Sequence, residues 1–360
     1  MNDRALRGAL VGYGFIGARG HLPAYARLGA GSPLRITAVA DTCAARRDKA
    51  RADLAGARVY ETHAEMLDKE AGQLDFVDVC TPPSDHAEIA HAALDRGLHV
   101  LCEKPLTTTV ADARALLDHA RRARRVVYPA HNYKHAPVIK AVRRILDSDV
   151  VGAVRLVTLQ TFRTTHARGV PEWRTNWRRE RRYSGGGIAM DHGSHTFYLA
   201  FDWLGSWPTA ITAKMSTLGD HDTEDNLTCS ISFPNGAASA HLSWTAGLRR
   251  VLYTIHGQRG AIRVEDDEVE TVVGDAAADG SVRWQTQREQ VSSRWMDASH
   301  AAWFRSLFEQ FAAAIRAGDW VSREAETALR CMELIQTAYA SADAGSREMR
   351  LGAAAEDLGR

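Results

Sequence analysis

The sequence lacks the features that mark several large classes of protein. No apolar run in its 360 residues approaches the roughly 20 residues that a membrane-spanning helix needs, and the first residues show no signal-peptide pattern. The net charge is only +1, so no overall field favours nucleic acid or an anionic membrane. The five cysteines are scattered without a C-x-x-C pair, as in proteins whose thiols stay reduced. We therefore expect a cytoplasmic protein with no nucleic-acid or membrane partner.

A glycine-rich turn follows the first apolar run. Residues Leu6 to Val11 predict a strand, and the next six have G-x-G-x-x-G spacing: Gly12, Tyr13, Gly14, Phe15, Ile16 and Gly17. Gly12 permits a sharp turn, Gly14 leaves room for a pyrophosphate beside the backbone, and Gly17 lets the next helix pack against the strand. The start of that helix offers N–H groups and a partial positive charge to the phosphates. The turn, Phe15 and Ile16 included, predicts a dinucleotide-binding site.

The second apolar run indicates which dinucleotide binds. Residues Leu34 to Ala40 predict a strand that ends at Asp41, about where a carboxylate meets the adenosine ribose in such sites. A carboxylate there hydrogen-bonds the ribose hydroxyls of NAD and repels the extra phosphate of NADP. Arg46 and Arg47 follow and could bind that phosphate, but they begin a predicted helix and are expected to face solvent. We predict NAD as the cofactor, with NADP as the alternative.

Strand and helix patterns alternate through the first part of the chain. Further apolar runs predict strands at 76–80, 99–101 and 125–128, and helical spacing of apolar residues predicts helices at 88–96 and 110–123. Short apolar strands separated by helices indicate a parallel sheet covered on both faces. We therefore predict an α/β protein whose first domain, a doubly wound dinucleotide-binding domain, covers residues 1–131. Ligands of such sheets bind beyond the carboxyl ends of the strands.

After about residue 150 the pattern changes to a series of longer strands. These are predicted at 154–162, 209–215, 227–233, 237–244, 251–256 and 261–264, with a hairpin turn at Pro234-Asn235-Gly236. Helical patterns run up to residue 203 and cover 300–317 and 322–342, and 275–280 is expected to be a loop or hairpin tip. We predict a second α/β domain with a large, open, mostly antiparallel sheet over residues 132–345, followed by a tail over 346–360.

Several motifs together resemble the Gfo/Idh/MocA oxidoreductase family. After the glycine turn these are Cys80-Thr81-Pro82-Pro83 with His86, then Glu103-Lys104-Pro105, then Gly185-Gly186-Gly187 followed by Asp191 and His195. The resemblance runs from the N-terminus to past residue 200. It implies an N-terminal Rossmann domain, a C-terminal α/β domain, and homo-oligomers, dimers or tetramers, built through the C-terminal sheets. It also implies oxidation or reduction of a secondary alcohol or ketone on a sugar, cyclitol or related small molecule.

The chain departs from the family pattern at two places. Pro83 stands where the family often has asparagine, so a cofactor contact is either lost or made by the backbone. Lys134-His135 stands where the family commonly has an arginine and an aromatic residue, which leaves the substrate contacts there open. The cofactor contacts that the resemblance implies at matching positions are Thr81, Pro82, His86, Glu103 and Lys104.

The resemblance also implies the catalytic residues. Hydride transfer at an alcohol requires proton transfer at its oxygen, and histidine suits this near neutral pH. By the resemblance, His195 is the general acid/base, and Asp191, four residues earlier on a predicted helix, orients the substrate or the imidazole. Lys104 would steady a developing alkoxide, and it is one of only six lysines among the 45 basic residues. The alternatives are a histidine that only packs between helices and a solvated turn lysine.

The substrate-binding residues are less sharply indicated. His131, Asn132 and Tyr133 follow a predicted strand end and could line the pocket. Trp177 lies in the arginine-rich stretch 163–182 and could stack on a sugar ring, but this stretch could equally be a solvated excursion. His221 lies among acidic residues that lack ligand-like spacing with a second histidine, so we predict no metal site.

Three functions remain open on the sequence alone. The first, which we favour, is an NAD(P)-dependent dehydrogenase or reductase acting on a CH–OH group of a cyclitol, sugar or amino-sugar derivative, in either direction. The second is an NAD-requiring glycosidase that works by transient oxidation. The third is a non-enzymatic dinucleotide sensor, which we expect to lack the lysine and histidine that this chain has at positions 104 and 195.

Overall fold

The computed structural model describes residues 4–29, 32–276, 281–293, 295, 297 and 299–352. The chain forms two compact units, each assembled from several segments. Unit 1 comprises Met1–Asn132, Ala167–Gly185 and Ala298–Met332, and unit 2 comprises Tyr133–His166, Gly186–Asp297 and Glu333–Arg360. Unit 1 contains more than the residues before position 131, because two later segments of the chain also belong to it.

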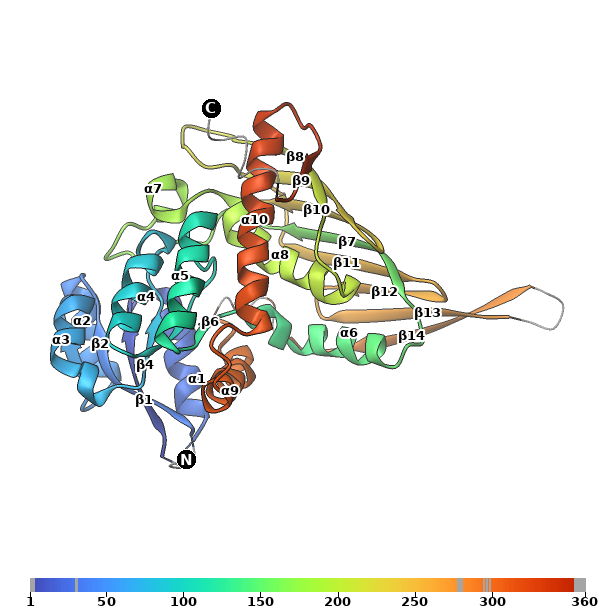
Figure 1. Cartoon of the computed structure of the whole chain (residues 1–360). Helices are drawn as coiled ribbons and strands as arrows, with labels where there is room; N and C mark the ends of the chain where they lie inside the picture. The colour runs from blue at the N-terminus through green and yellow to red at the C-terminus, as the bar shows by residue number, and fades with distance from the viewer. Residues whose placement is uncertain are drawn as a thin grey trace. The chain divides into compact units, whose positions relative to one another are not determined.

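Unit 1 contains a six-stranded sheet, sheet A, with the strand order β3-β2-β1-β4-β5-β6 (Figure 1). All five strand pairings are parallel. The strands are β1 (Leu6–Val11), β2 (Leu34–Ala40), β3 (Arg58–Tyr60), β4 (Phe76–Val79), β5 (His99–Cys102) and β6 (Val127–Pro129). The five predicted strands are confirmed to within two residues at each end, and the three-residue β3 was not predicted.

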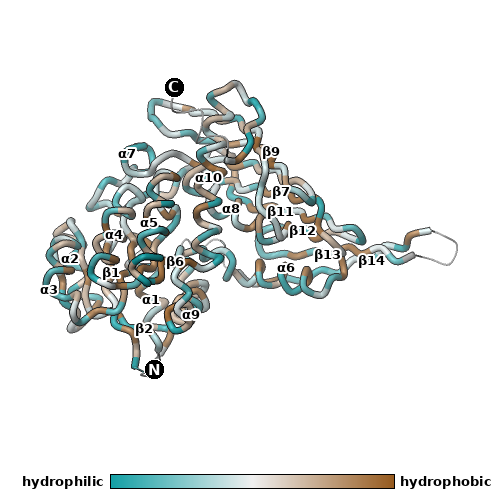
Figure 2. Tube along the Cα trace, in the orientation of Figure 1, coloured by the Kyte–Doolittle hydropathy of each residue, from teal (hydrophilic) through white to brown (hydrophobic). Residues whose placement is uncertain are grey.

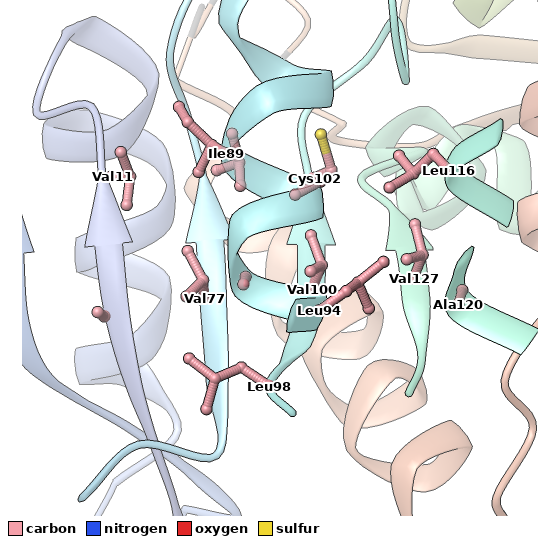
Figure 3. Packing of buried hydrophobic residues seen from close by; sticks show 14 of the residues in the cluster. Val11, Val77, Ile89, Leu94, Leu98, Val100, Cys102, Leu116, Ala120 and Val127 are labelled. Carbon is pink, nitrogen blue, oxygen red and sulfur yellow. The ribbon is translucent and has the colours of Figure 1, made fainter. Parts of the chain in front are cut away.

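Helices cover both faces of sheet A. On one face α3 (His63–Glu70), α4 (His86–Asp95) and α5 (Val110–Ala123) bury residues such as Ile89 and Leu116 against the strands (Figure 3). On the other face lie α1 (Leu22–Arg27), α2 (Ala44–Asp53) and α9 (Ala301–Ala317), where the Tyr25 and Phe308 rings stack 4.1 Å apart. The predicted doubly wound α/β architecture is confirmed. Helix α9 completes its core, which explains why a late segment belongs to unit 1.

Local sequence sets the helix ends in unit 1. Thr109 precedes α5, and its hydroxyl accepts a hydrogen bond from the Asp112 N–H at 3.1 Å, which caps the helix. At the other end Arg124 adopts the left-handed conformation (φ 52°) and stops it. In Figure 2 much of α2 and α3 is hydrophilic, as expected for helices that bury one face only. No helix among the described residues combines the length and hydropathy of a membrane span.

Unit 2 contains a nine-stranded sheet, sheet B, with the order β14-β13-β12-β11-β7-β10-β9-β8-β15. Strands β10 and β7 are parallel, and the other seven pairings among the described strands are antiparallel, as predicted. The strands are β7 (Val154–Phe162), β8 (Ala210–Ser216), β9 (Asn226–Phe233), β10 (Gly236–Ser243), β11 (Arg250–Gly257), β12 (Gly260–Glu265), β13 (Glu268–Ala276), β14 (Val282–Gln290) and β15 (Met349–Arg350).

Helices of unit 2 pack on sheet B. Helix α8 (Ile188–Leu204) contacts β7, β9 and β10, and α6 (Pro137–Asp147) contacts β13. Helix α10 (Arg323–Asp343) begins in unit 1 and ends in unit 2. Strand β15 lies within the predicted tail, so part of that tail belongs to the sheet, and residues 353–360 lie outside the described residues.

The β13–β14 hairpin extends far beyond the other strands of sheet B (Figure 1). Its two strands were not predicted, and for β14 the reason is that every residue is exposed and none forms a buried stripe. Strand β13 reaches Ala276, which overlaps the predicted tip at 275–280, and residues 277–280 lie outside the described residues.

Candidate functional site

The glycine turn after β1 leaves open space at one of its glycines. Gly12 has φ +94°, and a Cβ there would lie 2.7 Å from the Cys80 carbonyl carbon. A Cβ on Gly17 would lie 2.4 Å from the Gly12 oxygen, so only glycine lets the short π-helical turn η1 (Gly17–His21) begin here. A Cβ on Gly14 would meet nothing within 4 Å. The protein's own packing requires Gly12 and Gly17, whereas the space beside Gly14 suits an approaching pyrophosphate.

Asp41 lies just beyond the carboxyl end of β2 and is tied to this turn. Its Oδ2 accepts a hydrogen bond from the Tyr13 N–H at 2.6 Å, and its Oδ1 accepts one from the Cys43 N–H at 2.8 Å. Burial raises the pKa of Asp41, while these two backbone hydrogen bonds act in the opposite direction. Phe15, on the same turn, is 43% exposed, and Ile16 is partly buried. The carboxylate is thus fixed beside the turn, where a ribose contact was predicted.

The two arginines after Asp41 are not both solvent-facing. The prediction was wrong for Arg46, which is buried and donates from Nε to the Tyr13 carbonyl at 2.7 Å. Arg47 donates from Nη1 to the Asp41 and Thr42 carbonyls, each at 2.9 Å. Both guanidinium groups therefore bind backbone carbonyls around the predicted ribose position.

His86 connects the two motifs that follow β4 and β5. Its Nδ1 lies 2.8 Å from the Pro105 carbonyl oxygen, and its Nε2 lies 2.9 Å from that of Thr81. Burial lowers the pKa of His86, and the two carbonyls oppose that shift. The imidazole thus holds the Thr81-Pro82 loop against the Lys104-Pro105 turn. Its predicted role at the cofactor remains a prediction, and the structure gives it this bracing role in addition.

Glu103 belongs to a buried charged network that the sequence reading missed. His21 places Nδ1 2.8 Å from Asp78 and Nε2 2.9 Å from Glu103. Because carboxylates accept hydrogen bonds, both ring nitrogens donate and the ring is an imidazolium. Burial lowers the pKa of His21, but the electrostatic interactions and hydrogen bonds of Asp78 and Cys80 together outweigh it, and the pKa lies well above its ordinary value. A charged residue inside the apolar strand β4, such as Asp78, was the available signal, since it needs a buried partner.

Lys104 follows directly from this network. Its backbone N–H donates to the Glu103 Oε2 at 3.0 Å, and its side chain is half-buried. Burial raises the pKa of Glu103, but the hydrogen bonds and charges of His21 and Lys104 together outweigh this, and the pKa lies below its ordinary value. Glu103 is therefore ionised and holds the start of the turn that carries Lys104.

Cys80 lies next to this network, and together with His21 and Asp78 it brings three metal-ligating atoms within 4.8 Å of one another. Burial and Asp78 raise the pKa of the Cys80 thiol, which therefore stays protonated and is a poor metal ligand. The His21 and Asp78 atoms already bond to each other. Hydrogen bonding within the protein accounts for this cluster.

Glu224 fixes the start of the helix that carries the predicted catalytic residues in unit 2. Its carboxylate accepts hydrogen bonds from the Gly187 and Ala189 N–H groups, each at 2.9 Å, and from the Tyr339 hydroxyl at 2.9 Å. A Cβ on Gly187 would lie 1.9 Å from the backbone carbonyl oxygen of Glu224, so only glycine allows this close approach of the two chain segments. Glu224 is one of the acidic residues around His221 to which the sequence analysis gave no role, and in the structure it is a buried helix cap.

His195 lies on α8 among aromatic residues. Its ring stacks on Tyr133 with centroids 3.8 Å apart, and its Nδ1 lies 2.8 Å from the Tyr198 hydroxyl. That hydroxyl also accepts the Tyr133 N–H at 3.1 Å. A phenol oxygen can both donate and accept, so Tyr198 supports either tautomer of His195. The structure thus brings together two residues that were predicted separately, Tyr133 and His195.

Asp191 lies one turn before His195, in the first turn of α8. Its N–H donates to the Gly187 carbonyl at 3.0 Å, and its Oδ2 lies 3.3 Å from Nδ1 of the neighbouring His192. A carboxylate at this end of a helix is favoured by the helix dipole. The predicted placement of Asp191 and His195 on one helix is therefore confirmed.

The remaining predicted substrate residues lie in unit 1. His131 is buried and places Nδ1 3.2 Å from the Glu324 Oε2, and Asn132 is buried beside it in sequence. Trp177 begins the 3₁₀ turn η5 (Trp177–Arg179), and the Arg178 guanidinium lies 4.2 Å from its ring centroid. His131 therefore has a partner on α10, and its part in substrate binding remains a prediction.

Family models match most of the chain. Residues 6–131 match the model described as "Oxidoreductase family, NAD-binding Rossmann fold". Residues 139–263 match the model of the GFO/IDH/MocA C-terminal domain.

Individual relatives cover the chain to different extents. Inositol 2-dehydrogenase of Rhizobium meliloti (strain 1021) is 26% identical over 92% of this chain and 96% of its own length. D-xylose 1-dehydrogenase (NADP(+)) 2 of Haloferax volcanii is 26% identical over 84% of this chain and 89% of its own length. The alignment with levoglucosan dehydrogenase of Pseudarthrobacter phenanthrenivorans covers 52% of this chain and 55% of that protein. A solved levoglucosan dehydrogenase in complex with NADH has the same fold, with a TM-score of 0.83 at 21% identity over 97% of this chain and 99% of its own.

Proposed function

The chain belongs to the Gfo/Idh/MocA family of NAD-binding oxidoreductases, and we propose that it transfers hydride between NAD and a secondary alcohol or ketone of a cyclitol, sugar or amino-sugar derivative. The observation that carries this proposal is the turn after β1. Its outer glycines are required by packing, Gly14 faces open space, and the Asp41 carboxylate is fixed beside it. These residues fit the pyrophosphate and the adenosine ribose of NAD.

The residues of the chain supply the proton chemistry. When bound, NAD would accept or give the hydride. We assign His195 as the general acid/base, acting at Nε2, because Tyr198 and Tyr133 hold the ring from its Nδ1 edge and from one face. The Tyr198 hydroxyl can follow the change of tautomer when the proton moves.

Two further residues complete the proposed chemistry. The positive charge of Lys104 stabilises the developing alkoxide, and its backbone is held by Glu103. Asp191 orients the substrate hydroxyl or the imidazole from the turn before His195. We further propose that His131, Asn132, Tyr133 and Trp177 contact the substrate. We also propose that the active form is a cytoplasmic homo-oligomer.

The relatives support this substrate class. They include an enzyme named for inositol and others named for xylose and levoglucosan, which are all polyhydroxylated rings or sugars. A polyol offers several secondary alcohols, and tyrosine and tryptophan side chains combine an apolar face with a polar edge that suits such a ring.

The proposal is tested by NADH formation with the purified chain, NAD or NADP, and a panel of cyclitols, aldoses and amino-cyclitols. We expect turnover with one of these classes and a loss of about 100- to 10,000-fold in kcat for His195→Ala. His256→Ala, at an exposed histidine of the same unit, is the matched control and should keep most of the activity. Release of a sugar from a glycoside without net NADH would instead support the transient-oxidation glycosidase. Tight NAD binding with no turnover of either kind would support a sensor.

A further inference from the structure

One segment of unit 1, residues 167–185, lies outside the strands and long helices, and we call it the strap. Its own hydrogen bonds shape it: the Gly169 N–H donates to the Thr175 carbonyl at 2.7 Å, and Arg178 donates to the Ala167 carbonyl at 3.0 Å. The Arg174 guanidinium also lies 4.8 Å from the Tyr183 ring centroid. The strap is therefore a folded element with a defined course.

The strap touches the carboxyl edge of sheet A on both sides of the glycine turn. After β2, its Glu172 carbonyl accepts a hydrogen bond from the Cys43 thiol at 3.5 Å. After β4, its helix α7 (Arg181–Ser184) contacts the 3₁₀ turn η3 (Pro83–Asp85). Strand β1 lies between β2 and β4 in the sheet, so the glycine turn lies between these contacts. Dinucleotides bind at this edge, so the strap passes beside the proposed adenosine site.

The charges around the proposed ribose position are already balanced by the protein. Arg46 donates to the Tyr13 carbonyl, and its Nη1 lies 3.8 Å from the Glu172 carboxylate, which is 41% exposed. Arg47 binds two carbonyls and lies 3.5 Å from the Glu61 carboxylate. Dinucleotide sites usually select NADP with an arginine that attracts the ribose 2′-phosphate, and NAD with a carboxylate that repels it. Here the buried arginine faces an acid from the strap.

We infer that Glu172 is a specificity-determining residue that disfavours NADP, acting together with Asp41. A 2′-phosphate near Asp41 would meet a second carboxylate and would find Arg46 already paired. A tenfold change in affinity corresponds to about 1.4 kcal/mol, which is within the range of the repulsion between like charges a few ångströms apart in a partly exposed site. The inference rests on the proposed NAD site, and it assigns a role to a residue far from the dinucleotide motif in sequence.

The test compares NAD and NADP, which differ only by the 2′-phosphate, by isothermal titration calorimetry. For Glu172→Gln we expect NADP to bind roughly tenfold more tightly, with NAD affinity unchanged within about twofold. Raising the ionic strength to about 1 M should shrink this gain, because salt screens exposed charges. Glu180→Gln is the matched control: it removes an acid from the same strap, one that pairs with Arg174 and Arg182 rather than Arg46, and should leave both affinities unchanged.

Two results would overturn the inference while leaving the proposed function intact. One is an unchanged NADP-to-NAD affinity ratio in Glu172→Gln, and the other is a wild-type protein that already prefers NADP. If neither dinucleotide binds the wild-type chain, the proposed function itself fails. The binding readout therefore separates the two failures.

Discussion

Removing the imidazole of His21 should strongly destabilise unit 1. The ring is fully buried and bridges two carboxylates at 2.8 and 2.9 Å, and Tyr25 donates to Asp78 at 2.9 Å. His21→Asn would leave two buried carboxylates without their cation. Removing one partner of a buried ion pair costs about 3–5 kcal/mol, and we expect a loss of this size in the free energy of unfolding.

The loss in the free energy of unfolding caused by His21→Asn should depend on pH, and the pKa shifts of His21 and Glu103 determine its direction. The pKa of His21 is raised in the folded state, so its stabilisation is full below its unfolded pKa of about 6.5 and declines as the pH rises through the folded value. The pKa of Glu103 is lowered, so its stabilisation is full above its unfolded value of about 4.3 and declines at lower pH. The difference between wild type and His21→Asn should therefore be greatest at about pH 5–6.5 and smaller at about pH 9.

Urea denaturation at several pH values measures this effect, and hydrogen exchange at β4 and β5 localises it. His99→Asn is the control, because burial lowers the pKa of His99 to about 4 and no carboxylate bridges it among its described hydrogen bonds. A depressed histidine pKa reduces stability as the pH falls below about 6.5, so this variant should show the opposite pH trend. The double variant His21→Asn, Glu103→Gln should lose less than the sum of the two single losses. A cost below about 1 kcal/mol without pH dependence would refute the reasoning.

Three further predictions test the sites separately. Gly14→Ala should fold normally but bind NAD at least tenfold more weakly in calorimetry, since its Cβ meets only the space proposed for the pyrophosphate. Gly17→Ala should instead lower the melting temperature, because its Cβ would lie 2.4 Å from the Gly12 oxygen. Equal NAD binding by Gly14→Ala and wild type would contradict the proposed pyrophosphate site. Glu224→Gln should cost about 1–3 kcal/mol in urea denaturation, because the amide leaves a buried N–H unpaired. Lys104→Met should lower kcat about 100- to 1,000-fold in a steady-state assay at saturating NAD, and a kcat within threefold of wild type would remove Lys104 from the chemistry.

Much of the fold was predictable because it depends on local patterns. Strands β1 and β2 and helix α5 follow from apolar runs and helical spacing, and their observed bounds equal the predicted ones. The same patterns failed for β14, since all nine of its residues are exposed and none forms a buried stripe. They also missed β13, where Val269 and Thr271 are the buried residues. The compact units are not contiguous in sequence, because the aromatic face of α9 packs on α1, far away in the chain.

In the candidate site, too, residues in local motifs could be predicted and residues that depend on distant partners could not. The glycine turn, Asp41, Lys104, Asp191 and His195 lie in motifs whose spacing is visible in the chain. Residues defined by a tertiary partner were missed or misread: His21 depends on groups 57 and 82 positions away. Glu224 reaches back 37 positions to cap α8.

Hydride transfer between NAD and a carbon that bears a hydroxyl group is tested most directly by following the hydrogen itself. The substrate found in the panel would be prepared with deuterium on the carbon to be oxidised, and the cofactor would be analysed by mass spectrometry after a single turnover. We predict that the reduced cofactor carries the deuterium, and that the His195→Ala variant forms it far more slowly. Consumption of the substrate with the deuterium found in water, or with no reduced cofactor formed, would contradict the account.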